Sequence, residues 1–501
     1  MKKITAIGII CLSLIGYSCD DDFLVTTDPT RIGSDLFYKN QTQVEQALNG
    51  VYGQLQGITN TAYLFKEFTS DNTTLDFNPL DRGGASGWEA FEFSTVNSGN
   101  GEISNMWNGY YSAIYNVNFT LEKLAASTTI DQAAKGPLEG QLKFIRAFYY
   151  FDLVQYFGDV VLTTATLKKP EEAFALLRTP QADVYAQIEK DLKEAAAALP
   201  DKYNAANAGR VTKGAALTLL GKMYLTKKQY AEAVTTLQQV LPLGYALNTN
   251  YADNFDPTKK NGVESIFEVQ YQGGNDLGEW SSFMYTFAPR LSAAAVTGFG
   301  NVVPGGRNIP TNDMIAAYEP NDIRKDISLK TGYTNAKGEF VPVPFINKYR
   351  HQHTIAGRTD NNWPVLRYAD VLLMLAEAMN EVSGPTTEAY GYLNQVRKRA
   401  KLDELANLDK TTFREKVLHE RRVELAFENH RWFDLKRTKS PAELAQFMNA
   451  YATKEKANPT VPRGGVAFNA LDYVYVENEH VFPIPAPQIL INDKLSQNVG
   501  Y

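Results

Sequence analysis

Apolar residues recur at intervals of three and four along much of the chain, which is the spacing of one face of an α-helix. In residues 41–56, for example, Val44, Leu48 and Val51 fall on a single face. The same spacing predicts further helices over residues 103–125, 138–157, 180–199, 367–382, 386–401 and 411–430. The pattern therefore predicts a mainly α-helical fold.

One pair of these helices has the spacing of a tetratricopeptide repeat. Within residues 212–241, Leu217, Gly221, Ala233 and Leu237 fit the repeat, in which a small residue lets two helices approach closely. A weaker second copy lies in residues 373–396. A helical-repeat scaffold needs at least three units to bury a continuous core. Two other helix pairs are available for stacking, namely 103–125 with 138–157 and 180–199 with 212–226.

Two long stretches lack any helical period. Residues 60–100 are rich in Asn, Asp, Gly and Ser, and residues 244–365 hold many Gly and Pro with short strand-like pieces such as 265–271. Loop-rich segments of this length inside a compact chain are usually functional. We predict one globular domain over 41–501, with a helical scaffold in about 41–243 and 366–440, a ligand region in about 60–100 and 244–365, and extended, Pro-rich chain in the last 30 residues.

The N-terminus has the pattern of an export signal. Lys2 and Lys3 precede an apolar run that is too short to span a bilayer, and Cys19 follows it. A Cys at such a cleavage site resembles a bacterial lipoprotein, although Gly16 stands where a Leu is usual. We predict a lipoprotein signal peptide over 1–18, a lipid on Cys19 and a tether over 19–40. The alternative is a plain secretory signal with an incidental Cys.

Composition excludes several classes of function. The only other cysteine, Cys11, lies inside the signal, so no disulfide, thiolate metal site or catalytic thiol is expected in the mature chain. The net charge is −6, and loss of Lys2 and Lys3 makes it −8 (−6 − 2). This balance does not suggest nucleic acid as a partner. Beyond the signal, no stretch approaches the ~18 apolar residues of a membrane helix.

Several segments together resemble one family, the SusD/RagB nutrient-binding outer-membrane lipoproteins. Order and spacing hold from the signal to the last residue. The segments that carry the resemblance are 146–160 (RAFYYFDLVQYFGDV), 366–378 (LRYADVLLMLAEA), 418–428 (LHERRVELAFE), 431–437 (RWFDLKR), 482–485 (FPIP) and 497–501 (QNVGY).

The resemblance implies a tetratricopeptide-like scaffold and a glycan-binding protein on the outer membrane, exposed at the cell surface. It also implies a partner, a TonB-dependent (SusC-like) transporter, over which the protein sits as a lid that delivers oligosaccharide. The acidic residues 20–22 resemble the signal that sends such lipoproteins to the outer leaflet, although they also suit a solvated tether.

No motif recommends catalysis or a metal. Residues 419–423 begin like a zinc-protease helix but lack the second His, so the acidic and basic side chains around Arg421 are predicted to form ion pairs and helix contacts. His351 and His353 share one face of a strand without a third ligand that can be named. We therefore expect no cofactor and no metal. A carboxylate pair for glycoside hydrolysis remains possible among 56 acidic residues.

Sugar binding needs flat aromatic rings for the apolar face of a pyranose and polar groups for its hydroxyls. Trp107 and Trp432 are predicted to lie in the core. Trp88 and Trp280 lie in irregular, polar chain and are the main candidates for stacking, in regions where members of the family tend to place their ligand contacts. The weaker candidates are Trp363, Tyr285, Asn72, Arg82, Asp276 and Arg290.

The hypothesis is a non-enzymatic glycan-binding lipoprotein that feeds a transporter. One alternative is a peptide or glycopeptide receptor of the same lid type, and another is a surface glycosidase.

Overall fold

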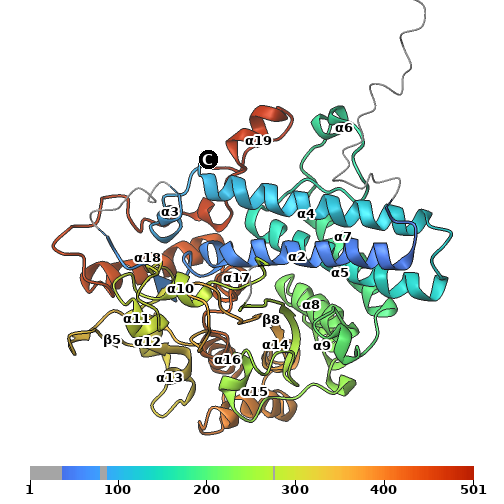
Figure 1. Cartoon of the computed structure of the whole chain (residues 1–501). Helices are drawn as coiled ribbons and strands as arrows, with labels where there is room; N and C mark the ends of the chain where they lie inside the picture. Colours follow the sequence, from blue (N-terminus) through green and yellow to red (C-terminus); the bar gives the residue numbers. More distant parts are fainter. Residues whose placement is uncertain (1–36, 79–86, 275–276) are drawn as a thin grey trace, which may run out of the picture.

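The computed structural model describes residues 37–78, 87–274 and 277–501, and it is mainly helical, as predicted. Long helices lie side by side in a stack that crosses the molecule, while short helices and strands fill the remainder (Figure 1). The longer helices are α2 (Gln41–Lys66), α4 (Gly101–Ala126), α5 (Gln132–Phe157), α7 (Gln181–Ala198), α8 (Lys213–Thr226), α9 (Tyr230–Gln238), α14 (Tyr368–Ser383), α15 (Thr387–Arg399), α16 (Lys410–Glu424), α17 (Arg431–Thr438) and α18 (Pro441–Ala457).

Two helices extend beyond what the apolar spacing indicated. Helix α2 continues to Lys66. Its last turn is buried on every side, so no one-sided apolar pattern marks this part of the helix in the sequence. Helix α18 was not predicted at all. It begins with a capping box, in which the Ser440 hydroxyl accepts the Glu443 N–H and the Glu443 carboxylate accepts the Ser440 N–H, followed by Pro441 in the first turn.

The predicted tetratricopeptide pair is formed by α8 and α9. The Thr212 hydroxyl caps α8 by accepting the Ala215 N–H at 3.3 Å. At Gly221 the two helices come so close that an added Cβ would lie 2.5 Å from the Leu237 side chain. Helices α14 and α15 form the second pair, and contacts of α5 with α7, α7 with α8 and α9 with α14 continue the stack. The scaffold is thus tetratricopeptide-like.

The strands are short, and all of their pairings are antiparallel. Strand β2 (Ser265–Val269) pairs with β8 (Trp363–Arg367), which brings the start and the end of the loop-rich stretch together. The other two-stranded pairs are β1 (Thr73–Thr74) with β3 (Ile309–Pro310), β4 (Leu329–Lys330) with β7 (Phe345–Ile346), and β5 (Tyr333–Thr334) with β6 (Phe340–Val341). The short helices are α3 (Glu89–Glu92), α6 (Pro170–Phe174), α10 (Phe283–Phe287), α11 (Ala294–Thr297), α12 (Asn312–Ala317), α13 (Arg324–Ser328) and α19 (Ala486–Ile491).

One large apolar core joins the scaffold to the loop-rich stretch. It contains Trp107 and Trp432, as predicted, together with residues from nearly all of the long helices and from β2 and β8. Within the described parts of the chain, no helix combines the length and the apolar character that crossing a membrane requires.

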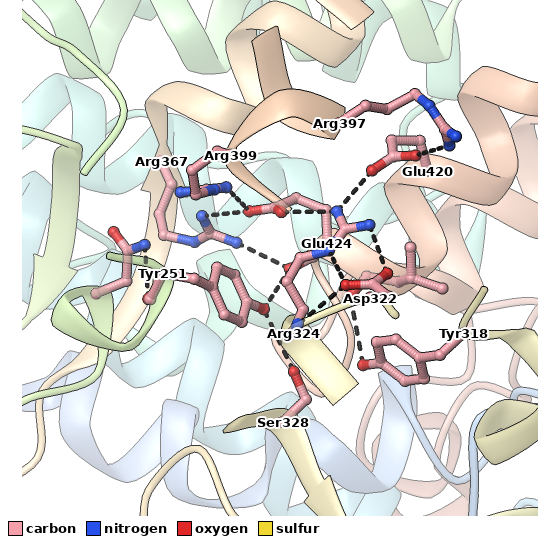
Figure 2. Close-up of polar contacts among 12 residues, drawn as sticks. Tyr251, Tyr318, Asp322, Arg324, Ser328, Arg367, Arg397, Arg399, Glu420 and Glu424 are labelled. Atoms are coloured by element: carbon pink, nitrogen blue, oxygen red, sulfur yellow. Dashed lines mark hydrogen bonds and ion pairs between the residues drawn. The ribbon is translucent and has the colours of Figure 1, made fainter. Parts of the chain in front are cut away.

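A buried network of charges joins the helical scaffold to the loop-rich stretch (Figure 2). The Glu424 carboxylate on α16 accepts hydrogen bonds from Arg367 at 2.9 Å, Arg399 at 2.6 Å and Arg324 at 3.0 Å. Burial alone would raise the pKa of Glu424, but the three guanidinium groups hold it well below its usual value. The Arg/Glu-rich helix therefore forms ion pairs, as the sequence predicted.

Candidate functional site

Trp280 lies half-buried in the chain between β2 and α10, on a backbone held at both ends. The Gln272 N–H donates to the Glu279 carbonyl at 2.8 Å, and Ser281 exchanges two backbone hydrogen bonds of 2.9 Å with Thr359. The neighbouring Arg358 places its guanidinium 4.3 Å from the centre of the Trp280 ring. A cation over the face of an indole is attracted by the ring's negative face. The ring is thus held in one orientation with one face covered.

Trp88 has the same arrangement at a second place. The residue precedes α3 and is half-buried, with its ring 6.3 Å from that of Phe68. The Arg307 guanidinium lies 4.6 Å from the centre of the Trp88 ring, and its Nη1 donates to the Tyr63 hydroxyl at 3.0 Å. The second candidate indole is therefore also backed by an arginine that is itself tied to the core.

Helix α10 connects these two places. Trp280 stands three residues before its first residue, Phe283, and the segment that carries Arg307 is bonded along the helix. In this segment the Gly305 N–H donates to the Tyr285 carbonyl at 2.8 Å and the Arg307 N–H to the Thr286 carbonyl at 3.0 Å. Gly305 is required there, since an added Cβ would lie 2.7 Å from the Thr286 carbonyl oxygen. One short helix thus follows Trp280 in the chain and holds the segment that carries Arg307.

Arg290, a weaker polar candidate, lies beside α10, and its Nε is buried. Its backbone N–H donates to the Asp76 carboxylate at 2.8 Å, and within the described residues its Nε has no hydrogen-bond partner. Burial raises the pKa of Asp76, and the Arg290 N–H offsets part of that rise. The backbone around Gly306 is close-packed, since a Cβ there would lie 2.4 Å from the Arg290 side chain.

Three of the predicted ligand contacts are buried and serve the fold. Trp363 is 3% exposed and stacks on Tyr349 with ring centres 5.1 Å apart. Asn72 is 1% exposed, and its side-chain Oδ1 accepts a hydrogen bond from Arg422 Nε at 2.9 Å. The Tyr285 hydroxyl lies 2.7 Å from His353 Nε2. These side chains do not reach the surface, so none is retained as a ligand contact.

Three other predictions fall outside the described residues. Arg82 and Asp276 lie in the ranges 79–86 and 275–276, and the proposed lipidation residue Cys19 lies in 1–36. They remain predictions.

The two arginines that back the indole rings were not identified from the sequence. Arg307 follows Gly305 and Gly306, and Arg358 follows Gly357, so both stand in turn-like chain without a period. The one sequence feature that both arginines share is a glycine immediately before them. This feature is weak, because it does not indicate which aromatic ring the arginine contacts in the fold.

The described residues contain no candidate metal site. No three His, Cys, Asp or Glu side chains in residues 37–78, 87–274 and 277–501 are grouped so as to hold an ion. The His353 ring instead contacts Tyr285 and Phe299, with its Nδ1 3.0 Å from the His351 carbonyl oxygen.

Comparisons with known proteins agree on one family. A family model described as "SusD family" matches residues 330–501, and one described as "Starch-binding associating with outer membrane" matches residues 22–225. SusD-like protein P2 of Formosa agariphila is 27% identical, over 100% of this chain and 99% of that protein.

Solved structures agree with the fold. A laminarin-binding SusD-like protein is 26% identical, with a TM-score of 0.75 over 93% of this chain and 100% of the other. A SusD superfamily protein from Parabacteroides distasonis is 26% identical, with a TM-score of 0.77 over 94% of this chain and 100% of the other.

Proposed function

The chain belongs to the SusD family, and from this premise we propose that it is a cell-surface protein that captures oligosaccharide or polysaccharide and passes it to a TonB-dependent, SusC-like transporter. Members of the family are glycan-binding proteins rather than enzymes, and this chain is not an enzyme. The glycosidase alternative is therefore set aside. A peptide in place of the glycan is the alternative that the experiment below separates.

The observation that carries the proposal is the pair of arginine-backed indole rings around α10. A pyranose presents an apolar face that a flat ring covers, and a rim of hydroxyls that guanidinium groups can meet. Because Arg358 and Arg307 hold Trp280 and Trp88 in place, little side-chain freedom is lost when a sugar stacks on them. Each stacked ring contributes on the order of 1 kcal/mol beyond the area it buries, so a site of two rings binds weakly, roughly in the micromolar to millimolar range.

The similarity to a laminarin-binding protein supports the glycan class. Laminarin is therefore the first polysaccharide to test, although shared fold and 26% identity do not carry a specificity from one protein to the other.

An exposed apolar surface supports the transporter as partner. It is formed by Phe174 at the end of α6 and by the apolar residues of α19, and these two helices project from the same side of the molecule (Figure 1) and bury none of their own residues. Leu490 is 85% exposed and Ile491 is 62% exposed. The Asn492 side chain joins the two helices by donating to the Leu176 carbonyl at 2.8 Å. Exposed apolar patches of this kind mark interaction surfaces.

The groove beneath this surface is uncharged. It measures about 280 Å³ and runs along the outer face of α4, and none of the described residues that line it is an Asp, Glu, Lys or Arg. Such a lining suits an apolar segment of another protein better than an ionic one.

The same face also meets the start of the described chain. The Tyr38 ring packs against Phe119 at 5.6 Å, and Phe119 stacks on Tyr115, which lines the groove. A lipid on Cys19 would therefore hold this face toward the membrane in which the transporter sits. The outer membrane is thus the proposed location.

A glycan array tests the binding proposal. The purified protein, without its signal and lipid, is applied to immobilised polysaccharides that include laminarin, starch and xylan, with a peptide library beside them. We expect retention on at least one polysaccharide and no release of shorter sugars over hours. Retention on peptides alone, or release of shorter sugars, contradicts the proposal.

The lid proposal needs a test in cells. Cys19→Ala is expected to leave glycan binding by the purified protein unchanged and to abolish uptake of the glycan. Ile491→Asp is expected to leave binding and membrane attachment unchanged and to reduce the amount of transporter that co-purifies with the protein. If uptake persists while the Cys19→Ala protein is released from the membrane, the tethered-lid account is wrong.

A further inference from the structure

A second concave surface lies at the junction of the scaffold and β2. This groove measures about 310 Å³. It is formed by the connection between α7 and α8, by the turn after α9 and by the chain that leads into β2. These segments correspond to residues 201–212, 243–245 and 261–268. Its volume is at the lower end of the range for small-molecule sites and is large enough for one or two sugar rings.

Two tyrosine rings line the groove. The Tyr245 hydroxyl lies 2.9 Å from the Thr212 hydroxyl, and its ring lies over Gly214, where an added Cβ would come within 2.5 Å. This ring is therefore fixed. Tyr203 is half-buried, and its hydroxyl has no hydrogen-bond partner in the described chain. Burial raises the pKa of Tyr203 to about 12, so the hydroxyl is protonated at neutral pH.

The rim of the groove carries polar groups of both signs. Asp201 and Lys202 are exposed there and carry opposite charges. Three further polar residues line the groove but are already engaged by protein partners, namely Glu268 by Asn362, Arg210 by Asn49 and Asn261 by Gln270. A rim that balances its charges does not select a charged ligand, but it offers donors and acceptors to hydroxyl groups. Glycines 209, 244 and 262 lie between these side chains and bring the backbone to the surface of the groove.

The groove is linked to the Trp280 site through a short series of contacts. Asn261, which lines the groove, follows Lys260, and Lys260 Nζ lies 2.8 Å from the Asp360 carboxylate. Asp360 stands two residues after Arg358, whose guanidinium covers Trp280. The same Asp360 carboxylate accepts the Gly273 N–H at 2.8 Å, in the chain that leads to Trp280. The Asp360 carboxylate thus connects the segment that lines the groove to the segment that carries Trp280.

We propose that this groove is a second carbohydrate subsite, which takes further sugar units of the same neutral glycan chain whose other units stack on Trp280. The inference rests on the proposed function and adds a preference for chain length. An oligosaccharide long enough to reach from Trp280 to Tyr203 gains the contacts of both surfaces, whereas a short one gains those of Trp280 alone. The gain is an effective-concentration effect, because the second contact becomes intramolecular.

The test is an array of laminari-, malto-, cello- and xylo-oligosaccharides of two to eight units, read with the parent protein and three variants. Tyr203→Ala removes the ring. Ala208→Trp fills the groove from an exposed position, so it does not depend on a core substitution. Tyr392→Ala, a half-exposed tyrosine on α15, is the control.

We expect the parent to bind long chains more tightly than short ones. Tyr203→Ala and Ala208→Trp should each weaken long-chain binding about fivefold or more, and leave short-chain binding and the control unchanged. If both variants keep the parent's affinity at every length, the subsite does not exist. If the parent binds no oligosaccharide of any length, the proposed function itself fails, and the subsite fails with it.

Discussion

The Arg358 guanidinium lies 4.3 Å from the centre of the Trp280 ring. The arginine lies over one face of the indole, and the Trp280 side chain is half-exposed. Arg307 does the same for Trp88 at 4.6 Å. This repeated pairing of an indole with an arginine is the feature on which the proposed glycan site depends.

Removal of the Arg358 guanidinium should weaken glycan binding. In Arg358→Ala the indole is no longer held, so part of its freedom must be lost on binding, and we expect an affinity two- to fivefold lower, equivalent to about 0.5–1 kcal/mol. Titration calorimetry with the glycan found on the array measures it. Lys439→Ala is the control, since Lys439 lies 5.0 Å from the Phe447 ring on the scaffold. A higher affinity in Arg358→Ala would mean that the arginine blocks the ring.

Two glycine substitutions test the close approach of α8 and α9. Gly221→Ala places a Cβ 2.5 Å from the Leu237 side chain, and we expect the free energy of unfolding to fall by about 1–3 kcal/mol. Gly50 lies inside α2 with no atom within 4 Å of an added Cβ. Gly50→Ala should therefore raise the stability, by about 0.5–1 kcal/mol. Urea unfolding followed by circular dichroism compares them, and equal effects at both positions would contradict the repeat geometry.

The buried charge network should be sensitive to the loss of one carboxylate. Glu424→Gln leaves Arg324, Arg367 and Arg399 without their shared negative charge, and the expected loss of stability is about 3–5 kcal/mol. Glu139→Gln is the matched control, since the Glu139 side chain is 46% exposed and its partner Lys143 keeps a second carboxylate, Glu194. The loss there should be about 0–1 kcal/mol. Thermal unfolding of the two variants measures the difference. Similar melting temperatures for Glu424→Gln and Glu139→Gln would show that the network does not hold the helical scaffold to the loop-rich stretch.

One buried acid, Glu67, contributes a term that lowers the stability as the pH rises. Burial raises the pKa of Glu67 to about 8, and the carboxyl accepts the Asn429 N–H at 2.8 Å, with Lys348 and Glu428 nearby. Between the unfolded pKa near 4.5 and about 8, the folded state keeps a proton that the unfolded state has lost. Its contribution to stability is therefore complete below about pH 4.5 and is lost as the pH rises to about 8.

Glu67→Gln removes this proton-linked term. Compared with the parent, the variant should lose less stability from pH 5 to pH 8, by on the order of 1 kcal/mol or more. The pKa of Lys348 is lowered by burial to about 8, so this amine affects the slope only above that pH. Denaturant unfolding at pH 5, 6.5 and 8 measures the slopes. Parallel slopes for parent and variant would show that Glu67 is ionised in the folded protein.

The helical scaffold could be predicted because its side chains face one core. Where one face of a helix is buried, as in α4 and α7, apolar residues recur at helical spacing and mark the element. The signal is lost where burial is complete. The last turn of α2 is such a case, since Tyr63, Leu64 and Phe65 are all buried. The sequence before α18 does contain the Ser440 and Glu443 of a capping box, but the apolar pattern of that helix is weak, so the helix was not predicted.

The candidate site could be predicted only in part, because it is built from loops. A tryptophan in polar chain indicates an exposed ring or a buried anchor, and local sequence does not separate the two. Trp280 is half-exposed, whereas Trp363 is buried against Tyr349, which is 14 residues earlier in the chain. Asn72 is buried by Arg422, which is 350 residues away. Partners this distant are set by the tertiary fold.

The central claim is that the two indole rings form the glycan site, and affinity electrophoresis of Trp280→Ala, Trp88→Ala and the double variant tests it most directly. The gel contains the polysaccharide that the array identifies, and Tyr115→Ala, an exposed ring on α4, is the control. We predict that each single variant binds about five- to tenfold more weakly, that the double variant migrates as if no polysaccharide were present, and that the control is retarded like the parent. Retardation of the double variant equal to that of the parent would contradict the account.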